Sequence, residues 1–295
     1  MRHRIIIDTD IGTDVDDLWT VGMIPGLLDV QLEAITLVYG DTEARARLAV
    51  HACAVMGLDV PIHRGCQETL SGKKILWAGY EGEGFADLDT ISCSAMHSVD
   101  ALIYQATLLP KTLNVVAIGP LTNIATAIQR DPSFAINVRH ISVMGGEFAA
   151  GWPEHNFSSD VTATGIVLKS GIPMTIMPLN QTLRLVLDRS DITAIAESHP
   201  IGPLMADQAE KFWRWLTQIV PSATGSSSAA HDPAALLAFV EPTLFEFKPM
   251  HVVISDEGQV RGVPNGSSPI NVVTDFDVPA VRTRLLNLLG VFSTI

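Results

Sequence analysis

Residues 5–17 read Ile5-Ile-Ile-Asp8-Thr-Asp10-Ile-Gly12-Thr-Asp14-Val-Asp16-Asp17, an apolar run that passes directly into five aspartates. The apolar run predicts a short buried strand, and the apolar residues at 18–23 predict the start of a helix. Open α/β sheets place their active sites at such a strand, glycine turn and helix, beyond the carboxyl ends of the strands. The stretch therefore predicts both the fold class and the position of a functional site.

The aspartates of this stretch are too dense to be explained by helix capping alone. Asp8 and Asp10 are two residues apart, so on a strand end both side chains point to one face. Two carboxylates about 4 Å apart repel by roughly 4 kcal/mol at an effective dielectric constant near 20. Asp14 as an N-cap, with Asp17 three residues on, accounts for only one or two of the five. A bound cation is the simplest explanation for the remaining aspartates. The alternatives are raised pKa values of their carboxyls or separation of the side chains into solvent.

The composition is that of a globular protein able to bury a large core. The chain has 295 residues, 47% of them hydrophobic and 17% charged, which fits one large α/β domain or two small ones. The net charge of −13 and the lack of a basic run argue against nucleic acid as a partner. Strand residues begin at position 4 and no apolar stretch approaches the roughly 20 residues of a membrane span, so we expect no signal peptide and no membrane contact. Cys53, Cys66 and Cys93 are widely spaced and form no CxxC pair, which favours reduced thiols in a cytoplasmic protein.

Strand-like and helix-like segments alternate along most of the chain. Strands are predicted at 5–7, 32–39, 113–118, 140–144, 173–177, 252–255 and 270–273, and helices from 18 and at about 42–57, 96–109, 121–128, 160–169 and 277–289. Residues 65–92 predict a long loop, and residues 189–240 are mainly helical with a break at 221–228. The alternation predicts an open, mostly parallel, twisted sheet with helices on both faces. Because no internal repeat or obvious linker occurs, we expect a single α/β domain over residues 1–295.

Polar residues gather where the predicted strands end. They occur in the segments Gly40-Asp41, Gly119-Pro-Leu-Thr-Asn123, Met144-Gly-Gly146, Glu154-His-Asn156 and His231-Asp232-Pro233. Each has an ordinary structural explanation, because Gly-Pro and Gly-Gly form turns and Asp232 before Pro233 matches a helix N-cap. All of them fall at the sheet edge that carries the aspartates, which favours one shared functional site.

In combination, these motifs resemble those of the inosine-uridine-preferring nucleoside hydrolase family. The resemblance rests on Asp8-Thr-Asp10-Ile-Gly12 with Asp16-Asp17, Gly119-Pro-Leu-Thr-Asn123, Val143-Met-Gly-Gly146, Glu154-His-Asn156 and His231-Asp232-Pro233, and on their order from residue 4 to the last helix. It implies a nucleoside hydrolase fold with a Rossmann-like core. It also implies hydrolysis of the N-glycosidic bond of a ribonucleoside to ribose and free base, with a tightly held Ca²⁺.

The resemblance implies a role for individual residues. As metal ligands it implies Asp10, Asp17, Asp232 and the backbone carbonyl of Ile118, with Asp8 in a supporting position. As substrate-binding residues it implies Asp16, Glu154 and Asn156 on the ribose hydroxyls, Met144 packed on the sugar, and Asp41 where some members have Asn. Ligation by oxygen alone suits Ca²⁺ or Mg²⁺ rather than zinc, and Ca²⁺ is favoured because it accepts up to about eight ligands.

The expected mechanism follows from the charge that develops on the sugar. Cleavage of the ribosyl C1′–N bond builds positive, oxocarbenium-like charge, which a ring of carboxylates stabilises. The metal lowers the pKa of a water molecule, and Asp10 is the expected general base. His231, next to a metal ligand, is the expected residue to supply or position a proton for the leaving base. The alternative is a histidine that only packs or forms structural hydrogen bonds.

Several positions depart from the family pattern and leave the base preference open. Asp41 replaces an Asn, and the short loop before Glu154 lacks the Asn that many members use on the ribose 5′-hydroxyl. Glu81 replaces a His, and the aspartate turn carries the extra residues Thr13-Asp14. Trp152, Trp213 and Trp215 are candidates to stack on a base, although the last two fit a core or interface position equally well.

Two other classes of function compete with nucleoside hydrolysis. Asp8-Thr-Asp10 resembles the DxD of haloacid-dehalogenase-like phosphotransferases, but no basic residue lies at the predicted strand ends to hold phosphate. A non-catalytic nucleoside- or ribose-binding protein on the same fold is the second, and Asp10 and His231 count against it. We expect a small-molecule nucleoside as the ligand and a homodimer or homotetramer as the assembly.

Overall fold

A central sheet of parallel and antiparallel strands organises the chain in a computed structural model that describes residues 2–83, 93–220, 225–266 and 268–292. The parallel strands are β1 (His3–Thr9), β2 (Val30–Leu37), β3 (Ile62–His63), β4 (Leu113–Ala117), β5 (His140–Met144), β6 (Met174–Met177) and β11 (Ile270–Phe276). Two antiparallel strands, β9 (Phe245–Ile254) and β10 (Val260–Val263), extend one edge. A separate small antiparallel pair joins β7 (Val186–Asp188) to β8 (Ser227–Ala229).

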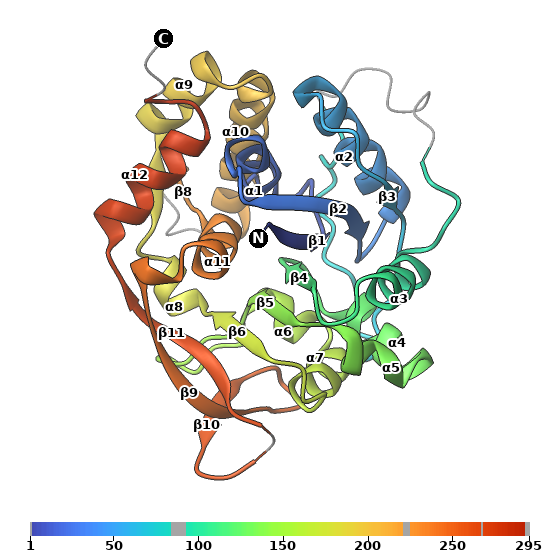
Figure 1. The fold of residues 1–295 in the computed structure, drawn as a ribbon. Helices are drawn as coiled ribbons and strands as arrows, with labels where there is room; N and C mark the ends of the chain where they lie inside the picture. Colours follow the sequence, from blue (N-terminus) through green and yellow to red (C-terminus); the bar gives the residue numbers. More distant parts are fainter. Residues whose placement is uncertain (1, 84–92, 221–224, 267, 293–295) are drawn as a thin grey trace.

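The strand order places a topological switch at β1. Within the described residues the nine strands follow the order β10-β9-β11-β6-β5-β4-β1-β2-β3 (Figure 1). The part β3-β2-β1-β4-β5-β6 is the doubly wound order, in which the chain reverses direction across the sheet between β1 and β4. Ligands of such sheets bind outside the carboxyl ends of the strands at this point. The topology therefore puts the binding crevice directly beyond Thr9.

Helices cover both faces of the sheet (Figure 1). One face carries α1 (Asp16–Met23), α2 (Thr42–Met56), α9 (Arg189–Ser198), α10 (Gly202–Ile219), α11 (His231–Val240) and α12 (Val278–Leu288). The other face carries α3 (Ser98–Leu108), α4 (Thr122–Arg130), α5 (Pro132–Asn137) and α7 (Val161–Leu168). Two short helices, α6 (His155–Ser159) and α8 (Leu179–Thr182), follow strand ends.

The two cores meet across β1. Ile5 and Ile7 pack into the core on the α1 side, and Ile6 packs into the core on the α3 side. All three side chains are fully buried, which explains why this strand is a continuous apolar run rather than an alternating one. Cys53, Cys66 and Cys93 form no disulfide.

The predicted α/β class, the parallel strands and the main helices are confirmed. Three predictions were incomplete: the strand predicted at 252–255 is only the end of the ten-residue β9, the turns predicted between 258 and 266 contain β10, and β3, β7 and β8 were not predicted. Residues 65–83 contain no helix or strand, as predicted, whereas the rest of the predicted loop (84–92) and residues 221–224 lie outside the described residues.

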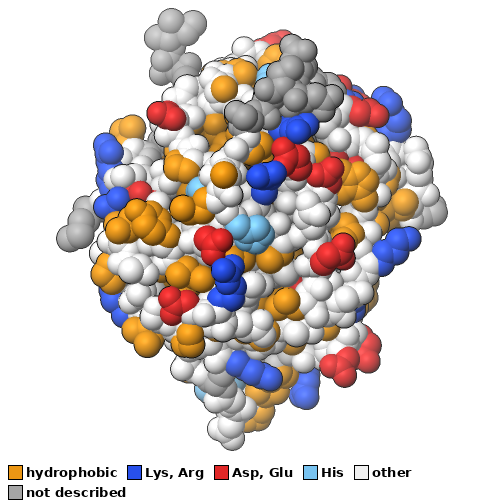
Figure 2. All heavy atoms as spheres, turned by 90° about the vertical axis from the view of Figure 1, so that its right-hand side faces the viewer, with side chains coloured by type: hydrophobic (Ala, Val, Ile, Leu, Met, Phe, Trp, Pro, Cys, Tyr) orange, Lys and Arg blue, Asp and Glu red, His pale blue; other side chains and the backbone are white. Residues whose placement is uncertain are grey.

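The described surface carries mixed charges. Figure 2 shows acidic and basic side chains interspersed on the face at the right of Figure 1, where α2 and α3 lie. No helix of the described residues has the length and apolar character needed to cross a lipid bilayer.

Candidate functional site

A cavity of about 300 Å³ opens beyond the carboxyl ends of β1, β4 and β5. Its lining brings together nine predicted site residues: Asp10, Asp16, Asp17, Ile118, Met144, Glu154, Asn156, His231 and Asp232. Thr13, Asp14, Leu76, Pro153, His155, Leu179, Phe212, Trp215, Leu216 and Ile219 complete it. The size fits a small organic ligand, for which pockets of about 300–1,000 Å³ are usual.

Three buried carboxylates form the floor of the cavity. Asp16, Asp17 and Asp232 each offer an oxygen within 4.8 Å of the others, and each residue is at most 4% exposed. Asp10 lines the same cavity and is 9% exposed. The grouping differs from the expected one because Asp16, rather than Asp10, completes the closest trio.

Hydrogen bonds fix the carboxylates at the starts of α1 and α11. The Thr9 hydroxyl donates to the Asp17 carboxylate, and the backbone N–H of Asp232 donates to Oδ2 of Asp16 over 3.1 Å. The second contact links the first turns of α1 and α11, which pack against each other. The two helices therefore bring aspartates 216 residues apart in sequence to one point.

Burial and mutual repulsion make these carboxyls weak acids. Burial, then the neighbouring carboxylates, raise the pKa of Asp16, Asp17 and Asp232 well above the usual range. Burial also raises the pKa of Asp14 to about 8, with contributions from Asp17 and Asp10. A bound cation would remove this cost, because an opposite charge favours the ionised form.

Asp8 lies behind the cavity rather than in its lining. Its Oδ2 accepts hydrogen bonds from the Thr36 hydroxyl at 2.6 Å and from the Asn123 amide at 2.8 Å. Burial raises the pKa of Asp8 to about 7, and Oδ1 has no hydrogen-bond partner among the described residues. Asp8 therefore ties β1 to β2 and α4, and its supporting role beside a metal site stays a prediction.

Glu154 and Asn156 line the cavity from the start of α6. The Glu154 carboxylate caps α6 by accepting from the backbone N–H groups of Asn156 and Phe157, and it also accepts from that of Gly146. Burial raises the pKa of Glu154. The Asn156 amide donates to the carbonyls of Ile118 and Met144, each over 3.2 Å. The expected ligand carbonyl of Ile118 therefore already accepts one hydrogen bond.

His231 contacts a residue that the sequence did not single out. Its Nδ1 lies 2.6 Å from the Thr182 hydroxyl at the end of α8, while the ring remains partly accessible from the cavity. Burial lowers the pKa of His231 to about 4, so the imidazole is neutral at pH 7. A neutral ring can orient or donate a proton from one nitrogen, but it does not act as an imidazolium.

The helix α10 gives the cavity an apolar wall. Phe212, Trp215, Leu216 and Ile219 line it. Of the three tryptophans predicted as stacking candidates, Trp215 lines the cavity. Trp213 is 1% exposed in the core, and its indole N–H donates to the Ser228 hydroxyl. Trp152 is 63% exposed and does not line the cavity.

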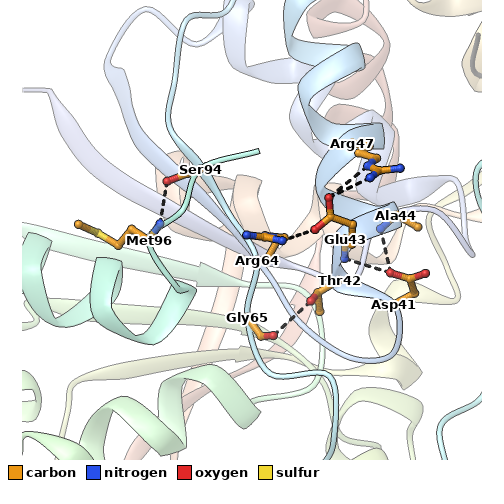
Figure 3. A network of polar contacts seen from close by, with 9 residues as sticks. All are labelled: Asp41, Thr42, Glu43, Ala44, Arg47, Arg64, Gly65, Ser94 and Met96. Carbon is orange, nitrogen blue, oxygen red and sulfur yellow. Dashed lines mark hydrogen bonds and ion pairs between the residues drawn. The ribbon is translucent and has the colours of Figure 1, made fainter. Parts of the chain in front are cut away.

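Asp41 is not in the cavity. It is the N-cap of α2, where it accepts from the backbone N–H groups of Glu43 at 3.1 Å and Ala44 at 3.0 Å, and it is exposed (Figure 3). The assignment of Asp41 to substrate binding is therefore corrected: its carboxylate satisfies helix N–H groups that have no intrahelical acceptor.

The extra residues of the aspartate turn contact the segment 78–81. The Thr13 hydroxyl donates to Glu81 at 2.9 Å, and the Tyr80 hydroxyl donates to the Thr13 carbonyl at 2.6 Å. Glu81 also accepts from the backbone N–H groups of Ala78 and Gly79, both at 2.7 Å. Glu81 therefore holds its own turn and binds the aspartate turn through Thr13, and it does not line the cavity.

Sequence reasoning also missed Arg45, which is fully buried in α2 beside the aspartate turn. Its signal was present: Thr42, Arg45, Ala46, Ala49 and Ala52 follow the spacing of one buried helix face, and a charge on such a face needs an explanation.

The acidic trio fits a single divalent cation. Two oxygens on opposite sides of one Ca²⁺ lie at most about 5 Å apart, and the trio stays within that limit. The donor set consists of carboxylate oxygens, which hard cations prefer. Asp16, Asp17 and Asp232, with Asp10 beside them, are the residues that would hold the ion.

Sequence comparisons agree with this geometry. A family model of the inosine-uridine preferring nucleoside hydrolases matches residues 5–283. The chain is 31% identical to the probable uridine nucleosidase 2 of Oryza sativa subsp. japonica, over 98% of this chain and 93% of that protein. It is 30% identical to uridine nucleosidase 1 of Arabidopsis thaliana, over 95% and 91% of the two chains.

A solved structure shares the fold. The plant nucleoside hydrolase PpNRh1 superimposes with a TM-score of 0.87 over 98% of this chain and 99% of its own, at 22% sequence identity. The family match extends through the aspartate turn and both helices that carry the acidic trio. This chain belongs to the inosine-uridine preferring nucleoside hydrolase family, whose members are N-glycosidases.

Proposed function

We propose that this protein hydrolyses the N-glycosidic bond of ribonucleosides with the help of one bound Ca²⁺. The observation that supports the proposal most directly is the meeting of the buried acidic trio with Glu154 and Asn156 in one cavity of about 300 Å³. The first group offers ligands for a cation, and the second offers hydrogen-bonding groups for a polyhydroxylated sugar.

The choice of Ca²⁺ rests on the donors and their spacing. Ca²⁺ accepts six to eight oxygen ligands in flexible geometry, so sites remain for hydroxyl oxygens after the aspartates have bound. When bound, the ion would supply charge stabilisation, orient the sugar hydroxyls and lower the pKa of a water molecule.

The ribose would be oriented by residues from the starts of α1 and α6. Asp16, Glu154 and Asn156 are 3%, 3% and 6% exposed, so hydrogen bonds that they form with hydroxyls are shielded from water. Met144 lines the same cavity, where the Asn156 amide contacts its carbonyl over 3.2 Å, and it would provide an apolar surface for the sugar. A sugar fixed in this way meets the attacking water in one orientation, which lowers the entropic part of the barrier.

The acidic cluster also suits the charge of the transition state. Departure of the base leaves positive charge on the ribosyl ring, and preorganised carboxylates stabilise it. Asp10 lies at the end of β1 in the cavity lining, where it would accept the proton of the attacking water.

His231 and Thr182 would assist the leaving base. The Thr182 hydroxyl has two partners, the Leu179 carbonyl at 3.2 Å and His231 Nδ1 at 2.6 Å. In the arrangement in which its single proton goes to Nδ1, the neutral ring carries its own proton on Nε2, from which it would be donated to the leaving base. The apolar wall of α10 beside it, with Trp215 and Phe212, suits an aromatic base.

The decisive test is the release of reducing sugar from a panel of ribonucleosides. Because the relatives at 30–31% identity are named uridine nucleosidases, uridine heads the panel, followed by inosine. We expect ribose release that stops when the metal is chelated and returns with Ca²⁺. Binding of a nucleoside without any release would instead indicate a binding protein on the same fold. The expected dimer or tetramer stays a prediction for light scattering.

A further inference from the structure

Arg45 is a buried cation that the catalytic scheme above does not use. It lies at the end of the first turn of α2 and is 0% exposed. Its Nε donates to the carbonyl of Tyr39 over 2.7 Å, and its Nη1 donates to the carbonyls of Ile11, over 2.8 Å, and Asp10. Nη2 has no hydrogen-bond partner among the described residues.

These contacts join the ends of two adjacent parallel strands. Asp10 and Ile11 follow β1 and begin the aspartate turn, whereas Tyr39 follows β2. Tyr39 has φ = 72°, a left-handed conformation that is uncommon for a residue with a Cβ atom. A guanidinium that binds the Tyr39 carbonyl helps to hold this conformation.

The other side of the guanidinium contacts the segment that follows residue 75. The Trp77 ring lies 5.0 Å from the guanidinium carbon, within the range of a cation–π contact. The next residue back, Leu76, lines the cavity, and its N–H donates to the Tyr39 hydroxyl over 2.8 Å. Arg45 is therefore surrounded by the aspartate turn, by Tyr39 and by Trp77.

The aspartate turn is pressed closely against α2. Gly12 has φ = 119°, and a Cβ atom there would lie 2.6 Å from Leu48 Cδ1 and 3.9 Å from Arg45 Nη1. The turn therefore has little room to shift without moving α2 as well. Its carbonyls face the guanidinium while its aspartates face the cavity.

Among the described residues the Arg45 guanidinium forms no ion pair with a carboxylate, and burying it is costly unless the local field compensates. The acidic cluster supplies such a field, and the charge of Arg45 in turn favours the ionised form of Asp17. The Arg45 guanidinium does more than balance the negative charge of the cluster, because its Nε and Nη1 each donate to backbone carbonyls at the end of a different strand. A planar guanidinium offers donors in fixed directions, whereas a lysine ammonium is a point charge on a flexible stem.

We propose that Arg45 is a positioning residue for the cation site: its guanidinium fixes the carbonyls of Asp10, Ile11 and Tyr39 so that Asp10 and Asp17 meet the ion in the correct geometry. The inference rests on the proposed function in that it requires a divalent ion at the acidic trio. Replacing a residue that positions metal ligands without touching the ion typically weakens metal affinity by about 10- to 100-fold.

The test is a calorimetric titration of metal-stripped protein with Ca²⁺, which needs no turnover. We expect Arg45→Lys and Arg45→Met each to weaken Ca²⁺ binding by about 10- to 100-fold. Failure of the lysine to rescue would show that the fork, and not the charge, is required. Arg47→Lys and Arg47→Met are the matched controls, because Arg47 lies two residues on in α2 and pairs at 3.2 Å with Glu43 on the outer side (Figure 3). These controls should bind Ca²⁺ as the wild type does.

A second measurement uses the wild-type protein and does not depend on folding of the variants. Amide exchange at 39–45 and 76–78, which contain no proposed ligand, should slow on Ca²⁺ addition, while exchange in α3 should not. Wild-type protein that binds no Ca²⁺ would overturn the metal part of the proposed function. Ca²⁺ binding with unchanged affinity in folded Arg45 variants, or unchanged exchange at 39–45 and 76–78, would overturn the role of Arg45 alone.

Discussion

Replacing Asp232 with Asn should have opposite effects on the metal-free and the metal-loaded protein. Asp232 is 4% exposed and shares the cavity floor with Asp16 and Asp17, within 4.8 Å. In the metal-free protein these carboxyls must either repel one another or take up protons. The isosteric amide keeps the shape of the side chain and removes one charge, so it should stabilise this state.

The size of the effect can be bounded. At 4.8 Å each pair of charges repels by roughly 3.5 kcal/mol at an effective dielectric constant of 20. Proton uptake limits the penalty, because protonating an ordinary aspartate at pH 7 costs about 4 kcal/mol. For a chain of 295 residues, 1 kcal/mol corresponds to about 1.6 °C in Tm. Asp232→Asn should therefore raise the Tm of the chelated protein by up to about 6 °C.

The metal-loaded protein should respond in the other direction. A thousandfold excess of Ca²⁺ over its Kd stabilises the wild type by about 4 kcal/mol, or about 7 °C by the same conversion. Asp232→Asn removes a ligand and should abolish most of this shift. Thermal melts with chelator and with Ca²⁺, at pH 7, measure all four values.

The matched control is Asp59→Asn at an exposed position, which should leave both melts unchanged. The reasoning would be refuted if Asp232→Asn lowered the Tm of the chelated protein while Ca²⁺ still raised the Tm of the variant as much as that of the wild type. In that case the carboxylate would stabilise the fold by contacts of its own, and the cation would bind elsewhere.

Further predictions concern turnover, selectivity and pH. Asp10→Asn leaves the acidic trio intact, so it should keep the fold and largely retain nucleoside binding but lower kcat by about 10²–10⁴-fold, as expected for loss of a general base; near-normal turnover would exclude that role. His231→Ala should cost less with p-nitrophenyl riboside, whose leaving group needs no proton, than with inosine, and equal losses would indicate a structural histidine. Because the loop at 147–153 is short, 5′-deoxyinosine should be hydrolysed about as well as inosine; a preference above roughly a hundredfold, about 2.7 kcal/mol, would contradict this. Burial lowers the pKa of His140 to about 4, so the unfolded chain binds a proton between about pH 6.5 and 4 that the native state does not, and stability should fall as the pH drops through this window. His140→Gln should reduce that slope in chemical unfolding by up to about 1.4 kcal/mol per pH unit, and an unchanged slope would mean that His140 titrates freely in the fold.

The parallel half of the sheet could be predicted because its strands are short apolar runs between helices. Of the antiparallel edge, only the end of β9 was predicted, at 252–255, whereas the rest of β9 and β10 were not. In β9, exposed and buried residues mix and Pro249 interrupts the pattern, which argues against a strand. Pro249 is tolerated because β10 pairs only with residues 251–254 and leaves the proline with a single neighbour, β11. That information lies in the pairing and is absent from the local sequence.

The site residues could be predicted for a topological reason. Residues that follow β1, β4 and β5 must come together, since these strands are neighbours and parallel. Asp232 could be predicted as well, because the motif His231-Asp232-Pro233 precedes a helix predicted at the same sheet edge. The apolar wall of α10 could not, because no strand end leads to it and its position depends on how the helix packs. Asp41 shows the opposite error: it follows a strand end, yet the N–H groups of α2 bind it on the outside.

Two departures from the family pattern form one structural unit. The hydroxyl of Thr13, in the aspartate turn, donates a hydrogen bond to Glu81. The Tyr80 hydroxyl contacts the same turn by donating to the Thr13 carbonyl. Without Glu81 the Thr13 hydroxyl would lose this acceptor, whereas Glu81 would keep the hydrogen bonds from the N–H groups of Ala78 and Gly79. Together the two contacts of Thr13 anchor the segment that carries Leu76 onto the loop that carries the acidic cluster. A shift of the aspartate turn would therefore also move the part of the cavity lining that Leu76 forms. We expect ligand selectivity in this protein to depend on the aspartate turn as well as on the apolar residues of α10.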